Sequence, residues 1–157
     1  MERKWTEKQK KVIDSRDKNL LVSAAAGSGK TAVLVARIIK MITDTENPVD
    51  IDKLVIITFT RAAAAQMRRK IADELEKLIE KEPENELYRR QQKLLGNAVI
   101  STIDSFCIGI VRAYFQRLEL DPGFRMADET ELKLIESDAM DELMEKYHNE
   151  GTPDFFI

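Results

Sequence analysis

Cysteine and histidine are almost absent from this sequence. Among 157 residues there is one of each, Cys107 and His148. A single cysteine excludes an internal disulfide, and these two residues cannot supply the ligands of a Cys/His metal cluster. The low cysteine content is typical of a reducing cytoplasm.

Long hydrophobic runs are missing as well. The longest apolar stretches have the length of a strand, and residues 1–11 are charged where a secretory signal would have an apolar core. We therefore expect a cytoplasmic chain with no membrane partner. The length is sufficient for one domain with its own hydrophobic core.

A glycine-rich segment after an apolar run is the most informative feature that is present. Residues 20–31 read LLVSAAAGSGKT, which is typical of a strand that leads into a triphosphate-binding loop and then a helix. Gly27 and Gly29 carry no Cβ to obstruct a phosphate or to disfavour positive φ angles. Lys30 would neutralise the β- and γ-phosphates, and Thr31 would bind the magnesium ion. The predicted nucleotide-binding residues of this loop are Ala24, Ala25, Ala26, Gly27, Ser28, Gly29, Lys30 and Thr31, the last two with a catalytic role.

The loop departs from the strict motif at one position, because Ala24 stands where the pattern has its first glycine. Residues 27–32 also match a dinucleotide-binding fingerprint, which is a second interpretation. That fold needs an acidic residue at the end of the next strand, whereas residues 54–58 are followed by Phe59 and Thr60. An ordinary strand-to-helix turn is the third interpretation.

Hydrophobic periodicity predicts short strands that alternate with helices. We expect strands over residues 19–23, 53–58 and 98–101, and helices over about 7–15, 30–42, 62–81 and 105–118, with a further polar helix that Gly96 ends. This alternation predicts an α/β fold with a parallel sheet, helices on its faces and ligands at the carboxyl ends of the strands. The residues of the long third helix expected to face the core are Met67, Ile71, Leu75, Leu78 and Ile79.

An aromatic residue and several cations follow the second predicted strand. Phe59 lies between two threonines, and Arg61, Arg68, Arg69 and Lys70 come after it. This is the combination expected where a nucleic-acid base stacks on a ring beside a bound phosphate. Residues 1–70 also hold 15 Lys and Arg against 8 Asp and Glu, which suits an anionic partner. The alternative is that Phe59 belongs to the core.

Four motifs, in this order and spacing, resemble those of UvrD-like superfamily 1 DNA helicases. They are WTEKQ at residues 5–9, AAAGSGKT at 24–31, ITFTRAAAAQM at 57–67 and STIDSFC at 101–107. Within that family, the triple alanine, the Ser-Phe-Cys ending and FRMADETE at residues 124–131 are most similar to the AddA type of helicase and nuclease subunit. The resemblance covers about residues 1–135.

The resemblance implies a fold, an activity and partners. Residues 1–120 would be the N-terminal part of a RecA-like P-loop motor domain (1A), and residues 121–157 the start of a helical insertion (1B). The cofactors would be ATP and Mg²⁺. The complete protein would unwind and degrade single-stranded and double-stranded DNA ends in double-strand-break repair by homologous recombination. It would work in the bacterial cytoplasm as a heterodimer with an AddB-like subunit.

The same resemblance assigns roles to residues outside the loop. Gln9 would recognise adenine, because its amide both donates and accepts hydrogen bonds. Lys70 falls where the family has an arginine near the γ-phosphate. Phe59 and Thr60 would lie on the single strand.

Two of the motif positions depart from the family. Arg61 and Asp104 stand where relatives often have asparagine and histidine. Arg61 can still hold a DNA phosphate, whereas Asp104 would repel one. Thr102 would contact DNA in the same loop as Asp104.

The Asp-Glu pair that this family uses to hold magnesium and polarise water is not found at the end of a hydrophobic strand. Asp128 and Glu129 are expected to open a helix, because residues 124–127 are too short for a buried strand and contain Arg125. We therefore expect an N-terminal portion that is not a motor alone, with exposed apolar surface and low stability or self-association. Two other classes stay open, a stand-alone P-loop nucleotide kinase or phosphotransferase and a non-catalytic nucleotide-binding adaptor.

Overall fold

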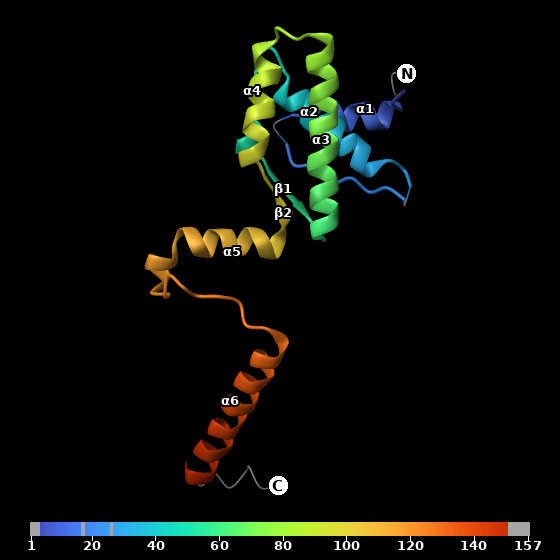
Figure 1. Cartoon of the computed structure of the whole chain (residues 1–157). Helices are drawn as coiled ribbons and strands as arrows, with labels where there is room; N and C mark the ends of the chain where they lie inside the picture. Colours follow the sequence, from blue (N-terminus) through green and yellow to red (C-terminus); the bar gives the residue numbers. More distant parts are fainter. Residues whose placement is uncertain (1–3, 17, 26, 151–157) are drawn as a thin grey trace. The chain divides into compact units, whose positions relative to one another are not determined.

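The structure is a computed structural model that describes residues 4–16, 18–25 and 27–150, with residue 150 described in its backbone alone (Figure 1). The chain forms two compact units, Met1–Val111 and Arg112–Ile157. None of the helices in the described part of the chain is both long and apolar enough to cross a membrane.

The first unit contains most of the regular structure. Its elements are α1 (Glu7–Asp14), α2 (Lys30–Ile42), the 3₁₀ turn η1 (Ile51–Lys53), β1 (Val55–Thr58), α3 (Arg61–Lys81), α4 (Glu86–Leu94), the 3₁₀ turn η2 (Leu95–Asn97), β2 (Val99–Thr102) and α5 (Ile103–Ala113). The predicted range of α2 is confirmed at both ends, and α3 and β1 begin within two residues of their predicted positions.

Capping side chains explain where three of these helices begin. The hydroxyl of Thr6 accepts a bond from the backbone of Gln9 at 3.3 Å, and the hydroxyl of Thr60 accepts one from Ala63 at 3.1 Å. Asn85 does the same for α4 with its side-chain oxygen. Each of these residues satisfies backbone N–H groups that have no partner within the helix.

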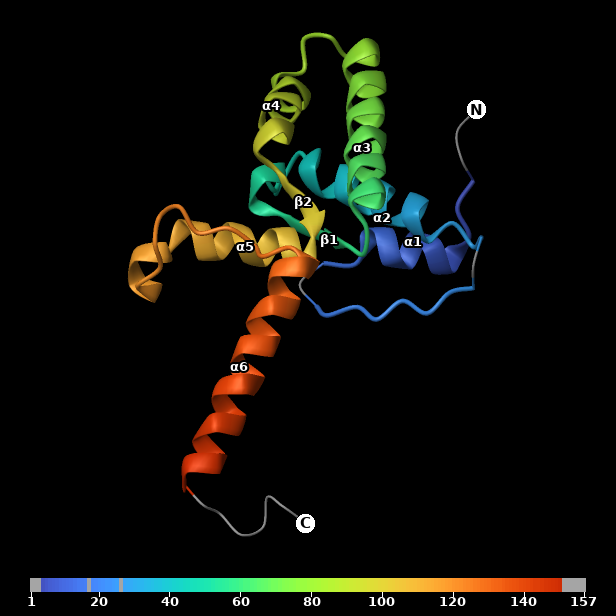
Figure 2. The ribbon, with the colours of Figure 1, turned by 60° about the horizontal axis from the view of Figure 1, so that its bottom comes forward.

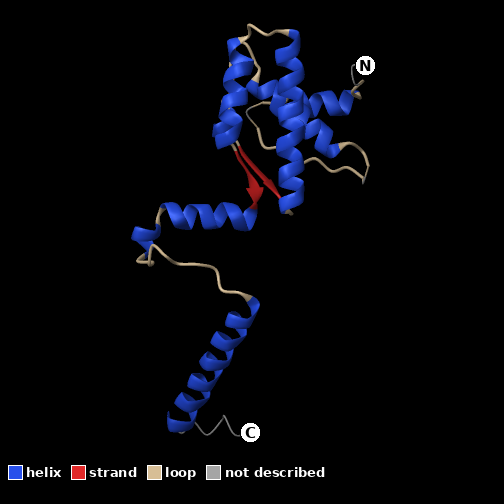
Figure 3. Ribbon diagram, in the orientation of Figure 1, coloured by secondary structure: helices blue, strands red, loops and turns tan. Residues whose placement is uncertain are grey.

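The two strands form a parallel pair, drawn in red in Figure 3. Their register joins Val55 to Val99 and Thr58 to Thr102. Because α3 and α4 connect the strands, both run in the same direction and end at the same edge. The α/β prediction is confirmed at this level, as a small parallel sheet packed with helices.

The predicted strand over residues 19–23 is wrong for this structure. The segment is a loop that leads from α1 back to the start of α2 (Figure 2). Leu21 is fully exposed, and Leu20 and Val22 are 41% and 45% exposed. A strand needs a neighbour to pair its backbone N–H and C=O groups, and no strand in the described residues pairs with this apolar segment.

The hydrophobic core lies between the inner face of the sheet, α2 and α3. Ile56 and Ile100 are buried side by side, whereas Val55 and Ile57 on the other face of β1 are 54% and 41% exposed. This alternation follows the two-residue period of a strand. The core residues of α3 are Ala64, Met67, Ile71 and Leu75, whereas Leu78 and Ile79 are half-buried.

The second unit contains the 3₁₀ turn η3 (Phe115–Leu118) and the long helix α6 (Glu129–Glu150). The predicted helix over 105–118 is therefore divided, because α5 ends at Ala113. The side chain of Asp128 accepts bonds from the backbone of Thr130 and Glu131, both at 2.9 Å. This cap confirms that the Asp-Glu pair opens a helix.

A buried glutamine fastens α4 to the segment before β1. Gln91 is fully buried, its Oε1 accepts a bond from Ile51 N at 2.9 Å, and its Nε2 donates to Asp50 Oδ1 at 3.1 Å. Arg90 binds both oxygens of the same carboxylate. The hydrogen bond from Arg90 lowers the pKa of Asp50.

We predict that Gln91→Leu destabilises the fold. The change leaves Ile51 N buried without an acceptor, which should lower the free energy of unfolding by about 1–3 kcal/mol. Urea denaturation measures this loss. The matched control is Gln92→Leu on the exposed side of the same helix, which should change stability by less than about 0.5 kcal/mol. Equal losses in the two variants would contradict the assignment.

Candidate functional site

The phosphate loop has the backbone that its glycines predict. Gly27 and Gly29 have φ angles of 75° and 84°, in the left-handed region that favours glycine. A Cβ added to Gly27 would meet nothing within 4 Å, so backbone conformation alone requires glycine there. Ala24 has no such requirement, because its φ is not positive. This explains how alanine can replace the first glycine of the motif. Ala26 lies outside the described residues.

The first turn of α2 presents unpaired backbone donors. The first helical bond runs from Val33 N to Gly29 O at 3.0 Å, so the N–H groups of Lys30, Thr31 and Ala32 have no helical acceptor. The first turn contains no acidic residue that could neutralise them. Together with the partial positive charge of the helix end, these amides form an anion-binding site.

The ammonium group of Lys30 lies over the loop itself. Its Nζ donates to the carbonyl oxygens of Ala24 and Ala25, both at 2.8 Å. An ammonium has three N–H groups, so one remains for a phosphate oxygen. Thr31 is exposed in the first turn of α2, where its hydroxyl is accessible to a metal ion.

Gln9 on α1 is bound directly to the phosphate loop. Its Nε2 donates to Ser28 O at 3.3 Å, and its Oε1 accepts a bond from Thr6 N at 2.9 Å. A backbone N–H can only donate and a carbonyl can only accept, so these two partners determine the orientation of the amide. The side chain keeps one further N–H and one further acceptor position for a ligand.

A cavity of about 510 Å³ lies between α1, the phosphate loop and α2. This volume is typical of small-molecule sites. Its lining residues are Thr6, Lys8, Gln9, Val12, Leu20, Val22, Ser23, Ala24, Ser28, Lys30, Val33, Leu34 and Arg37. The structure thus brings together four of the predicted nucleotide-binding residues, whereas Lys70, half-buried on α3, does not line the cavity.

Several lining residues were not identified from the sequence. The cavity wall includes Val12, Val22 and Leu34, which offer an apolar surface suited to a planar base. Arg37 also lines it. The apolar residues could have been found as those adjoining the loop on the predicted elements, but Arg37 has no local motif that marks it.

A second surface lies after β1, where Phe59 is fully exposed. The alternative that Phe59 belongs to the core is therefore wrong for this structure. The hydroxyl of Thr58 donates to Thr60 O at 3.0 Å, and Thr60 caps α3, so this turn is held from both sides of the ring. Arg61 is exposed at the first residue of α3.

Two residues expected near DNA have structural partners instead. Thr102 is 7% exposed, and its hydroxyl oxygen accepts a bond from Ser105 N at 3.2 Å at the start of α5. Arg68 is half-buried and donates to the carbonyl oxygens of Leu95 and Ala98. In this structure Thr102 begins a helix and Arg68 joins α3 to the chain before β2. Asp104 is exposed in the first turn of α5.

Within the described residues, no group of three or more His, Cys, Asp or Glu side chains could hold a metal ion. A magnesium ion at the loop would thus depend on Thr31 and on the oxygens of the bound phosphates. Hydroxyl and phosphate oxygens are ligands that Mg²⁺ prefers.

Comparison with known proteins agrees with the motifs. The family described as UvrD/REP helicase N-terminal domain matches residues 5–154. A protein of Acetivibrio thermocellus, named as the A-type subunit of an ATP-dependent helicase/nuclease, is 52% identical over 98% of this chain and 12% of its own length. Proteins of the same name from Clostridium perfringens strain SM101 and Clostridioides difficile strain 630 are 56% and 50% identical, over 90% and 97% of this chain and 11% and 12% of their own lengths.

These relatives confirm the resemblance to the AddA type of helicase and nuclease, since about half of all aligned positions are identical. The chain spans about one eighth of the length of these curated relatives. The match to the family extends over nearly the whole chain, from Trp5 in the first motif to residue 154. The chain therefore belongs to the UvrD/REP helicase family, as part of its N-terminal domain.

Proposed function

We propose that this chain is the ATP-binding N-terminal portion of a DNA helicase/nuclease subunit. The observation that carries the proposal is the cavity in which an anion-binding loop and an oriented glutamine amide lie side by side. A triphosphate and a purine base are the two parts of one ligand that would satisfy these groups together.

Adenine matches the remaining hydrogen-bonding capacity of Gln9. Adenine presents N6–H as a donor and N7 as an acceptor, and the amide has an acceptor position on Oε1 and a donor on Nε2. Guanine presents acceptors at both O6 and N7, so Oε1 would face another acceptor. We therefore expect a preference for ATP over GTP.

The phosphates would bind at the start of α2. The amides of Lys30, Thr31 and Ala32 are free to donate to phosphate oxygens, and Lys30 Nζ adds a positive charge. Thr31 would hold the magnesium ion, which offsets negative charge on the β- and γ-phosphates when it is bound. Catalytic roles for Lys30 and Thr31 follow from these contacts. Lys70 is a candidate for the γ-phosphate only if α3 is brought closer to the cavity.

Single-stranded DNA would bind at the carboxyl end of β1. The exposed ring of Phe59 offers a surface on which a base can stack, and Arg61 and the start of α3 offer a positive charge for the adjoining phosphate. Thr60 would hold this turn in place through its cap on α3. Thr102 would act indirectly, by fixing the start of α5.

The family relation extends the proposal to the complete protein. We infer that residues 1–120 belong to a RecA-like motor domain and that residues 121–157 begin a helical insertion. The complete protein would act with an AddB-like partner on DNA ends during recombinational repair in the bacterial cytoplasm. A nucleotide kinase or a non-catalytic adaptor would leave the exposed Phe59 turn without a role.

We predict that Lys30→Ala weakens ATP binding by at least about tenfold, which corresponds to about 1.4 kcal/mol for a lost charged contact to phosphate. Isothermal titration calorimetry of the chain with Mg²⁺ and ATP measures the affinity. Lys93→Ala, which removes an exposed lysine of α4, should bind ATP like the unchanged chain. Retained affinity in Lys30→Ala, or hydrolysis of ATP by the chain without DNA, would contradict the proposal.

We also predict that Phe59→Ala weakens binding to a single-stranded oligothymidine by about 1–3 kcal/mol, the range measured for loss of one base–aromatic stack. Fluorescence anisotropy measures the affinity, and thermal unfolding should be unchanged because the ring is fully exposed. Phe59→Trp should retain binding, since tryptophan also stacks. If Phe59→Ala bound the oligonucleotide as tightly as the unchanged chain, DNA would not bind at this turn.

A further inference from the structure

Helix α1 carries the adenine-reading residue but has little packing of its own. It contains eight residues, of which only Ile13 is buried. Helices this short are marginally stable in isolation, so their position depends on contacts with neighbours. The position of Gln9 beside the phosphate loop therefore depends on how α1 is attached to α2.

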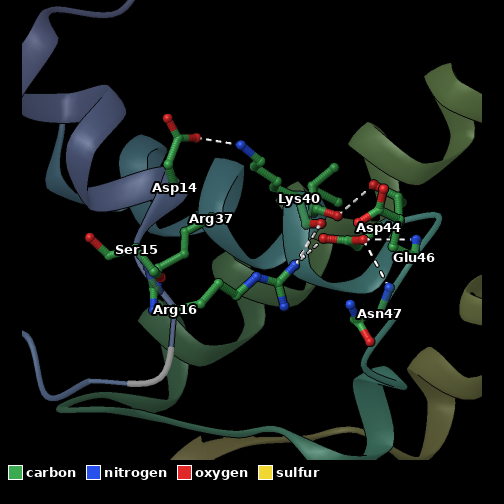
Figure 4. A network of polar contacts seen from close by, with 10 residues as sticks. Asp14, Ser15, Arg16, Arg37, Lys40, Asp44, Glu46 and Asn47 are labelled. Carbon is green, nitrogen blue, oxygen red and sulfur yellow. Dashed lines mark hydrogen bonds and ion pairs between the residues drawn. The ribbon is translucent and has the colours of Figure 1, made fainter.

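Polar contacts make that attachment at the carboxyl end of α1 (Figure 4). The guanidinium of Arg37, on α2, donates through Nη1 to Val12 O at 2.6 Å and also to Ser15 O. These carbonyls belong to the last turn and the cap of α1, where carbonyl oxygens lack helical partners and carry partial negative charge. Arg37 thus satisfies two acceptors that α1 cannot satisfy itself.

Two ion pairs lie on either side of Arg37 in Figure 4. Lys40 binds Asp14 at 2.5 Å, but both side chains are more than half exposed, and such pairs contribute little. Arg16 binds Asp44 at 2.7 Å, in a less exposed pair that joins the segment after α1 to the end of α2. Arg37 is the contact of this network that binds the helix backbone of α1 directly.

Arg37 also stands in register with the phosphate site. It follows Lys30 by seven residues on α2, and this spacing places both on one face of the helix, two turns apart. Both line the cavity, together with Gln9. One face of α2 therefore contacts the phosphates through Lys30 and holds α1 through Arg37.

We propose that Arg37 is a positioning residue for nucleotide recognition. It fixes α1 against α2 so that the Gln9 amide stays at a set distance from the phosphate loop and reads the base of a nucleotide whose phosphates are bound at Lys30. This inference rests on the proposed function, since it requires adenine to bind at Gln9. A binding group has to be held within about 0.5 Å of its working position, which a marginal helix cannot achieve alone.

The test measures base discrimination, which a loss of stability alone would not change. Dissociation constants for ATP, GTP and inorganic tripolyphosphate are determined for the full chain and for Arg37→Met, which keeps the aliphatic stem but no donor. We expect the preference for ATP over GTP to fall about tenfold, as for the loss of a single base contact. The affinity for tripolyphosphate should change less than about twofold, because Lys30 and the loop amides are intact.

Three controls make the result specific. Arg89→Met removes an exposed arginine outside the network and should keep the ATP preference. Arg37→Lys retains one donor and should give an intermediate preference, so the test does not depend on the stability of Arg37→Met alone. In a Gln9→Ala background, Arg37→Met should have no further effect on the preference, because both act on the same contact. Hydrogen exchange without nucleotide should show faster exchange in residues 7–14 of Arg37→Met and unchanged exchange in α3.

The outcomes separate the inference from the proposal beneath it. Equal weakening of all three ligands in Arg37→Met, or a further loss of preference in the Gln9→Ala background, overturns the positioning role and leaves the proposed function intact. If the unchanged chain binds ATP and GTP equally, adenine recognition by Gln9 fails and the positioning role fails with it. If Lys30→Ala binds ATP normally, the nucleotide site itself is wrong.

Discussion

The start of α2 is the constraint on which the rest of the site depends. Backbone N–H groups can hold a phosphate only if they lack helical acceptors and if no side chain or acidic group stands before them. Two left-handed glycines turn the chain into this position, and the small residues before them keep the approach open. Lys30, Gln9 and the cavity wall are all placed relative to this one helical turn.

Features with local causes could be predicted from the sequence, and features that need distant partners could not. The range of α2 follows from the glycines and the apolar period that succeed one another, and Thr60 marks the start of α3 through its own hydroxyl. The apolar segment 19–23 has the composition of a strand, but strand formation depends on a neighbour that pairs with it. Its local pattern therefore predicted a strand that the described residues do not form.

The same distinction applies to the site. The positive φ angles of Gly27 and Gly29 could be predicted because they are properties of single residues. The burial of Thr102 depends on how α5 begins, and the role of Arg37 depends on two backbone carbonyls more than twenty positions away, which any sequence can provide. A side chain that binds backbone atoms has no partner residue type to reveal it, so its role becomes visible only in three dimensions.

The capping box of α1 places two demands on one side chain. Glutamate serves as well as glutamine at the third position of such a box, because the helix uses only a side-chain oxygen. Only glutamine also offers the N–H that binds Ser28 O. The helix therefore accepts either residue at position 9, while the loop accepts one. Exchange of a single oxygen for a nitrogen at this position separates the information that builds the helix from the information that selects its ligand.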